Sequence, residues 1–158
     1  MSVTWEQCKI EFVPDVGNPL IDLYIKNTTL DDWNAFLAFA RSYGTCTFKV
    51  DSEPANLPGD AAAIFADQQE RSQFLAITFH GIQVNCHFFC VAEIELDFDP
   101  RQVCSSERFE SLKRFAEGLC QSLKREAIFT PEGSEELVFL SYEPLSNSWR
   151  HHPRGAIR

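Results

Sequence analysis

Acidic and apolar side chains alternate through residues 91–100, VAEIELDFDP, and this stretch offers the clearest candidate chemistry in the chain. On an extended strand its carboxylates share one face, about 7 Å from one to the next. Two of them are then too far apart to hold one metal ion without a ligand from an adjacent strand. We weigh a solvated acidic face, a surface for a basic protein and, least favoured, a metal or acid–base site. The predicted partner-binding residues are Glu93, Glu95, Asp97 and Asp99.

The cysteines and the histidine just before this row do not form a nucleophilic pair. Cys86 and His87 are adjacent, so a strand directs them to opposite faces and the imidazole cannot take the thiol proton. Cys86 and Cys90 stand about 13 Å apart on an extended strand, too far for a disulfide or a shared zinc ion. The chain also lacks a G-x-S-x-G turn, a glycine-rich phosphate loop and an H-E-x-x-H pair. The sequence thus predicts no catalytic residue, no metal and no cofactor.

The charge balance favours a basic protein as the partner. The 158 residues hold 14 Lys and Arg against 23 Asp and Glu, a formal net charge of −9. An acidic body repels phosphate backbones, so nucleic acid is a poor partner, whereas a basic protein is attracted. The N-terminal stretch lacks the basic start and apolar run of a signal peptide, and no apolar run is long enough to span a bilayer. We expect a cytoplasmic protein without membrane contact, with its six cysteines as buried thiols.

Two segments carry the apolar spacing of amphipathic helices. The first begins after Thr29, a residue type that caps helix N-termini, and stops at Gly44. The second begins after Ser105 or Ser106 and ends near Lys124 and has a continuous apolar stripe. The stripes consist of Leu30, Trp33, Phe36, Leu37 and Ala40 in the first helix, and Phe109, Leu112, Phe115, Ala116, Leu119 and Leu123 in the second.

The segment 82–99, which contains the acidic row, carries an unbroken apolar alternation. The preceding run 75–79 alternates too, and a two-residue turn at His80 and Gly81 would pair Phe79 with Ile82, so that a hairpin with one apolar face forms. Eighteen extended residues span about 60 Å, whereas the expected radius of gyration is only about 15 Å. We therefore predict a bend or bulge near residues 89–92, after which the acidic half belongs to a different part of the sheet or to its edge.

The remaining runs complete the predicted fold. Alternation predicts strands over 21–27, 45–51 and within 4–12, and two short strands over 127–130 and 137–142 that PEGSEE joins. Residues 51–73 form a loop with a short helix that Asp60 caps. This order indicates an α+β fold, with a mostly antiparallel, strongly bent sheet and two long helices packed on one face. We predict a single α+β domain over residues 1–145 and a flexible C-terminal tail over 146–158.

The C-terminal part of this pattern resembles a known class of protein. A long amphipathic helix followed by AIFTPEGSEELVFLSYEP, residues 127–144, is similar to the ending of small acidic bacterial proteins of the polymorphic-toxin immunity type and of related uncharacterised families. The resemblance covers about a quarter of the chain. It implies a non-enzymatic protein that binds and neutralises a toxin domain, with the acidic surface mimicking or blocking what a basic toxin engages.

Three hypotheses for function follow from these observations. The first is a non-catalytic acidic protein-interaction module, with an immunity-type inhibitor of a basic partner as its finer form. The alternative is a small-molecule-binding or enzymatic α+β domain with a pocket between the polar sheet face and the 51–73 loop, where His87 and Glu93 are the candidate groups. A homodimer through an edge strand is the third, and the solution mass distinguishes it.

Overall fold

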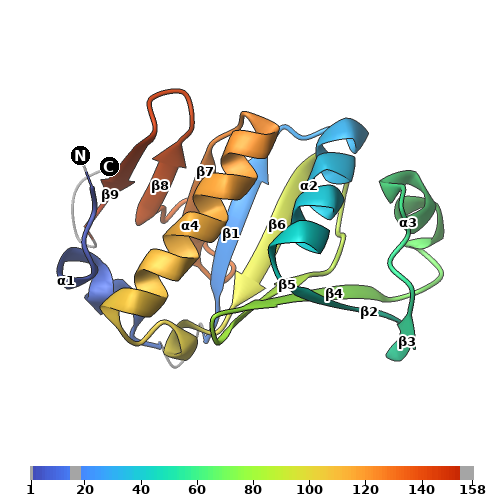
Figure 1. Cartoon of the computed structure of the whole chain (residues 1–158), viewed down its shortest axis with the longest axis horizontal. Coiled ribbons are helices and arrows are strands. Elements are labelled where there is room, and N and C mark those ends of the chain that lie inside the picture. The colour runs from blue at the N-terminus through green and yellow to red at the C-terminus, as the bar shows by residue number, and fades with distance from the viewer. Residues whose placement is uncertain (1, 15–18, 154–158) are drawn as a thin grey trace.

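The elements of the fold are four α-helices and nine strands within residues 2–14 and 19–153, the part of the chain that the computed structural model describes (Figure 1). Two short 3-10 helices, Lys9–Phe12 and Pro100–Gln102, complete them. The α-helices are α1 (Trp5–Cys8), α2 (Leu30–Tyr43), α3 (Ala61–Asp67) and α4 (Ser106–Leu123). The strands are β1 (Ile21–Lys26), β2 (Thr45–Val50), β3 (Glu53–Ala55), β4 (Gln73–Phe79), β5 (Ile82–Cys86), β6 (Glu93–Phe98), β7 (Ala127–Pro131), β8 (Leu140–Glu143) and β9 (Ser148–His151).

All nine strands belong to one sheet, in the order β3-β2-β4-β5-β6-β1-β7-β8-β9. Every neighbouring pair is antiparallel. Figure 1 shows α2 and α4 side by side across one face of this sheet. The chain thus has the antiparallel α+β fold that its sequence predicts. The strand with the acidic row, β6, lies at the centre of the sheet and not at its edge.

The helices form because capping residues stabilise their ends and apolar residues on one side pack against the sheet. At the start of α2, Thr29 accepts a hydrogen bond from the backbone N–H of Asp32, whose carboxylate in turn accepts one from the backbone N–H of Thr29. The fully buried side chains of α2 and α4 then face the sheet, and each contributes about 1.5–3 kcal/mol by its removal from water. Phe115 of α4, for example, stacks on Phe79 of β4 with ring centroids 4.8 Å apart. No helix in the described part of the chain is both long and apolar enough to cross a membrane.

The segment 82–99 is two strands, which corrects the single bent strand that its alternation predicts. The first strand ends at Cys86, the second begins at Glu93, and the two pair antiparallel with Asn85 opposite Asp97. The chain reverses between them, where Phe88 adopts a positive φ of 57°. Because the length is divided in this way, the sheet needs no strong bend, and the predicted strong bend is not confirmed. The preceding hairpin has the predicted register, with Phe79 opposite Ile82.

Both ends of the chain also differ from the sequence prediction. The predicted strand within residues 4–12 is α1 followed by a 3-10 helix, and Thr4 and Gln7 cap α1 through reciprocal hydrogen bonds. Where the sequence predicts a flexible tail over 146–158, residues 148–151 form β9 at the edge of the sheet. Trp149 is only 9% exposed there, and its indole N–H donates to Glu117 of α4 at 2.6 Å. Burial of that ring accounts for the ordered strand, whereas residues 154–158 lie outside the described part.

Candidate partner-binding surface

Three of the four predicted carboxylates lie on the face of the sheet that the helices leave open. Glu93, Glu95 and Asp97 alternate along β6 with side chains that are fully buried in the core on the other face. The fourth residue, Asp99, lies beyond the end of the strand. It caps the 3-10 helix there, and its carboxylate forms an ion pair with Arg101 at 2.7 Å, which lowers the pKa of Asp99. Asp99 is therefore already neutralised by its own neighbour and stands apart from the other three.

A further carboxylate joins the row from β1. The antiparallel register places Asp22 directly opposite Asp97, and such neighbours have Cβ atoms about 5 Å apart. Asp22 is only 3% exposed, and it accepts hydrogen bonds from the hydroxyl of Tyr24 and the backbone N–H of Gly133, each at 3.2 Å. Burial raises the pKa of Asp22 in spite of these bonds. We call Asp22, Glu93, Glu95 and Asp97 the open-face cluster.

Two basic side chains neutralise part of this cluster. The ammonium group of Lys26 lies 2.9 Å from the carboxylate of Glu93 and also pairs with Glu135 of the loop between β7 and β8. His87 Nε2 lies 3.5 Å from Asp97 Oδ2, and the hydrogen bond to Asp97 raises the pKa of His87. Among the described residues, no cation lies within ion-pair distance of the other two members, Asp22 and Glu95.

Glu95, for which the described residues provide no cation within ion-pair distance, has a raised pKa. Its side chain is partly buried, and burial together with the charges of Asp22, Glu93 and Asp97 raises its pKa to about 7. Like charges at this separation disfavour one another's ionised form, and burial removes the water that would screen them. Near neutral pH the open-face cluster therefore holds a carboxyl group that is protonated in part of the molecules. A cation brought to Glu95 would favour its charged form.

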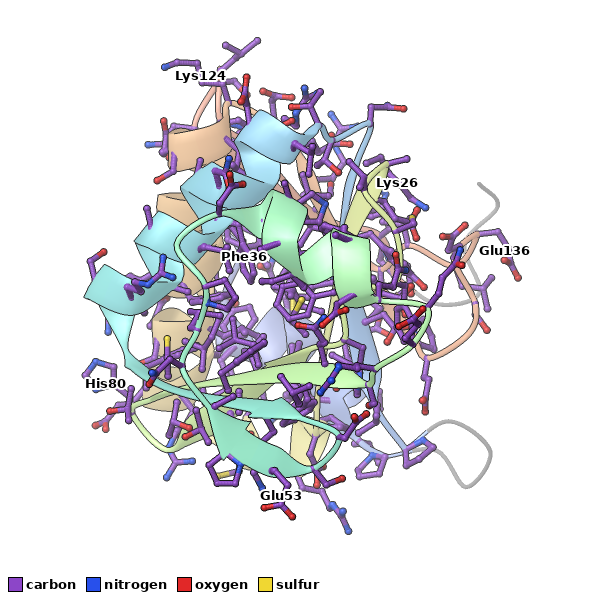
Figure 2. The ribbon with its side chains drawn as sticks, turned by 90° about the vertical axis from the view of Figure 1, so that its right-hand side faces the viewer. Lys26, Phe36, Glu53, His80, Lys124 and Glu136 are labelled. Carbon is purple, nitrogen blue, oxygen red and sulfur yellow. The ribbon has the colours of Figure 1, made fainter. Side chains whose placement is uncertain are left out.

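The loop between β7 and β8 borders the cluster on the β1 side. Gly133 of this loop donates to Asp22, Glu135 pairs with Lys26, and Tyr24 beneath is buried. In Figure 2, Lys26 and Glu136 lie to the right of Phe36, a residue of α2 that is fully buried in the core. The loop thus adds acidic side chains to the same open face, and the negative charge there comes from three separate segments of the chain.

A hollow of about 250 Å³ borders the cluster on the β5 side. It lies where the sequence predicts the alternative pocket, because part of the 51–73 segment lines it together with His87. Glu93, the other residue predicted for that pocket, does not line it and pairs with Lys26 instead. The lining consists of Gln68, Arg71, Ser72, Gln73, His87, Phe88 and Phe89.

Other hollows also lie among the described residues. One of about 640 Å³ runs along the first turns of α4 beside His80, but Arg108 in its lining already donates to the carbonyl oxygens of Gly81 and Gln102. One of about 240 Å³ lies between the ends of β1 and α4. No group of three or more His, Cys, Asp or Glu side chains in the described residues is arranged to hold a metal ion.

The alternation in the sequence thus located three members of the cluster, while the fourth required the fold. Nothing local marks Asp22, because its place beside Asp97 depends on the pairing of β1 with β6. The chain matches no protein-family model, and the comparisons with curated proteins and with solved structures found no match. The resemblance to immunity-type proteins therefore stays a prediction.

Proposed function

We propose that this protein is a non-catalytic module that binds a basic protein segment through the open face of its sheet. The observation that carries the proposal is the open-face cluster, in which four carboxylates gather and two have no cation within ion-pair distance among the described residues. The chain's net charge of −9 acts in the same direction, since it attracts a basic partner from a distance. The finer form of the proposal is an immunity-type inhibitor, whose target is a basic toxin domain.

The physical basis is the incomplete neutralisation of the cluster. Glu95 and Asp22 both have raised pKa values, so the isolated protein stabilises their charged forms poorly. A lysine or arginine side chain of a partner would supply the missing cation at Glu95, which is only partly buried, and a charge pair there is stronger than on an exposed surface. Lys26 already shows this arrangement within the chain, because its ammonium lies between Glu93 and Glu135 and 4.5 Å from the ring centre of Tyr24.

A small-molecule site at the hollow beside His87 is the second candidate. It is favoured by the imidazole that lines the hollow and contacts Asp97, since a carboxylate that orients a histidine also occurs in general bases. The size of the hollow counts against this candidate. At about 250 Å³ it falls below the roughly 300–1,000 Å³ of typical ligand pockets.

The test compares neutralised acids at two places on the protein. One variant combines Glu93→Gln, Glu95→Gln and Asp97→Asn, which removes three charges from the open face and keeps the side-chain shapes. Both the wild type and this variant serve as bait in a lysate of the native host, and their affinity for a hexa-arginine peptide is measured at low and moderate salt. Three lost ion pairs at roughly 0.5 kcal/mol each predict about tenfold weaker peptide binding.

The matched control changes the net charge equally at exposed positions elsewhere. It combines Glu53→Gln, Glu70→Gln and Glu107→Gln, which all lie outside the open-face cluster. We expect the control to bind the peptide like the wild type and to capture the same basic protein. Equal loss in both triple variants would show that only net charge matters, and that outcome would remove the open face as the binding site.

A further inference from the structure

The hollow beside the open-face cluster presents an exposed aromatic ring in a fixed position. Phe89 is 55% exposed, and its ring stacks on His87 with centroids 5.3 Å apart and planes 21° apart. His87 also contacts the ring of Phe74, at 5.2 Å between centroids. The amide group of Gln68 also donates to the backbone oxygen of Phe89. A large apolar ring that is held in place yet open to solvent is the surface type that binding hot spots use.

Charge differs between the two halves of this surface. The hollow is lined by two basic side chains, Arg71 and His87, and by no acid. Arg71 pairs with Asp67 at 3.5 Å, and His87 meets Asp97, so their charges are partly offset. A partner's cation would therefore be repelled from the hollow and attracted to the cluster. The group that fits the hollow is uncharged and flat enough to lie against Phe89.

The size and polarity of the hollow further limit which chemical group of the partner can occupy it. A volume of about 250 Å³ has room for one large side chain, whereas whole ligands occupy roughly 300–1,000 Å³. Gln68 and Ser72 bring an amide and a hydroxyl to the lining, which suit the polar tip of a tryptophan or tyrosine. The hollow and the cluster are contiguous, because His87 lines the one and lies 3.5 Å from Asp97 of the other.

We propose that the hollow beside Phe89 receives an aromatic side chain of the basic partner, while arginine or lysine residues two positions from it in the partner's sequence lie against the open-face cluster. This inference rests on the proposed function and adds the chemistry of the recognised segment. In an extended segment, side chains two residues apart stand about 7 Å from each other, a spacing that bridges the His87 ring. The partner's recognition segment therefore combines cations with one aromatic anchor.

The experiment uses two peptides of equal length and charge, RGGGRGR and RGWGRGR, and in the second an arginine lies two residues from the tryptophan on each side. The single tryptophan should raise the affinity for the wild-type protein by about three- to tenfold, the usual contribution of one aromatic pair. Phe89→Ala should abolish this difference and leave the affinity for RGGGRGR unchanged. Because Phe89 is largely exposed, its removal leaves the core intact. The control is Leu145→Ala, another exposed apolar residue, at 88%, which should keep the tryptophan advantage.

The outcomes separate this inference from the function on which it rests. If the wild type binds both peptides equally, or if Phe89→Ala keeps the tryptophan advantage, the aromatic anchor is wrong while the acidic surface stands. If neither peptide binds, the proposed function and the anchor fail together. A wild-type dimer that Phe89→Ala converts to a monomer would show that the hollow receives a second copy of the chain, and that result would also overturn the proposal.

Discussion

Replacing Glu95 by glutamine removes one charge from the open-face cluster and keeps the length and shape of the side chain. The folded protein raises the pKa of Glu95 from 4.5 to about 7, through burial and then the charges of Asp22, Glu93 and Asp97. Between these pH values the folded state binds more protons than the unfolded chain. The stability of the wild type therefore falls as pH rises through this window, and the loss is complete above pH 7. A glutamine at this position does not titrate, so the variant escapes that loss.

The expected gain follows from the size of the shift. A rise from 4.5 to about 7 corresponds in full to about 3 kcal/mol. Glu95 is only partly buried, and solvent screening reduces this value, so we expect the variant to be about 1–2 kcal/mol more stable at pH 8. With a urea m-value of about 2 kcal/mol per molar, the unfolding midpoint rises by about 0.5–1 M. At pH 4 the two proteins should have equal midpoints.

The assay is urea unfolding of both proteins from pH 4 to pH 9 at constant ionic strength. Histidines titrate in both proteins, so the difference between their midpoints at each pH isolates the carboxyl group. Because the charges of Asp22 and Glu95 act on one another, the pH at which the difference appears belongs to this pair and not to Glu95 alone. Glu53→Gln, on the exposed strand β3, is the control and should change stability by less than about 0.5 kcal/mol. A Glu95→Gln midpoint equal to that of the wild type at pH 8 would refute the reasoning.

Three further predictions concern the fold. Gly44→Ala should destabilise the protein by about 1–3 kcal/mol in thermal unfolding, because the added Cβ would lie 2.6 Å from a backbone oxygen of β4. The control is Gly59→Ala, whose added Cβ meets no atom within 4 Å and should not destabilise the protein. Alkylation of the native protein, followed by mass spectrometry, should modify Cys90 and Cys104 first, since burial raises the pKa of the other four thiols, and rapid labelling of all six would contradict this. Thr29→Ala should cost about 1 kcal/mol in urea unfolding by loss of the α2 cap, and an unchanged midpoint would count against that cap.

The sequence was sufficient to predict those elements whose start, end and buried face are all marked by nearby residues. A capping threonine, an apolar stripe and a terminal glycine together mark α2, and each acts within one helical turn. The β4–β5 hairpin was equally local, because the turn at His80 and Gly81 fixes which side chains meet. The N-terminal segment shows the limit of alternation alone. Cys8 and Phe12 are buried as a strand would require, but Ile10 is 66% exposed, and the capping pair Thr4 and Gln7 was the better signal.

The site depended on contacts between distant parts of the chain. The length of the segment predicted a bend near residues 89–92, but no glycine or proline in residues 87–92 marks the full reversal at Phe88 that separates β5 from β6. This reversal brings His87 back toward Asp97, whereas Asp99 leaves the row because β6 ends at Phe98 and a 3-10 helix follows. Asp22 joins the cluster only through the pairing of Ile21 with Phe98 and of the residues that follow. Local patterns give the faces of a strand, whereas its neighbours depend on the whole fold.

The central place of β1 has a consequence for synthesis on the ribosome. Of the nine described strands, β1 is synthesised first, yet its two neighbours are β6 and β7. Ile21 therefore cannot pair until Phe98 and Pro131 have been synthesised. Until then an apolar strand, buried at five of its six positions in the finished protein, has neither edge paired. The β2–β4–β5 part can assemble earlier from nearby residues. The nascent chain therefore passes through a stage in which half of the sheet exists and its future centre is exposed to aggregation and to chaperones.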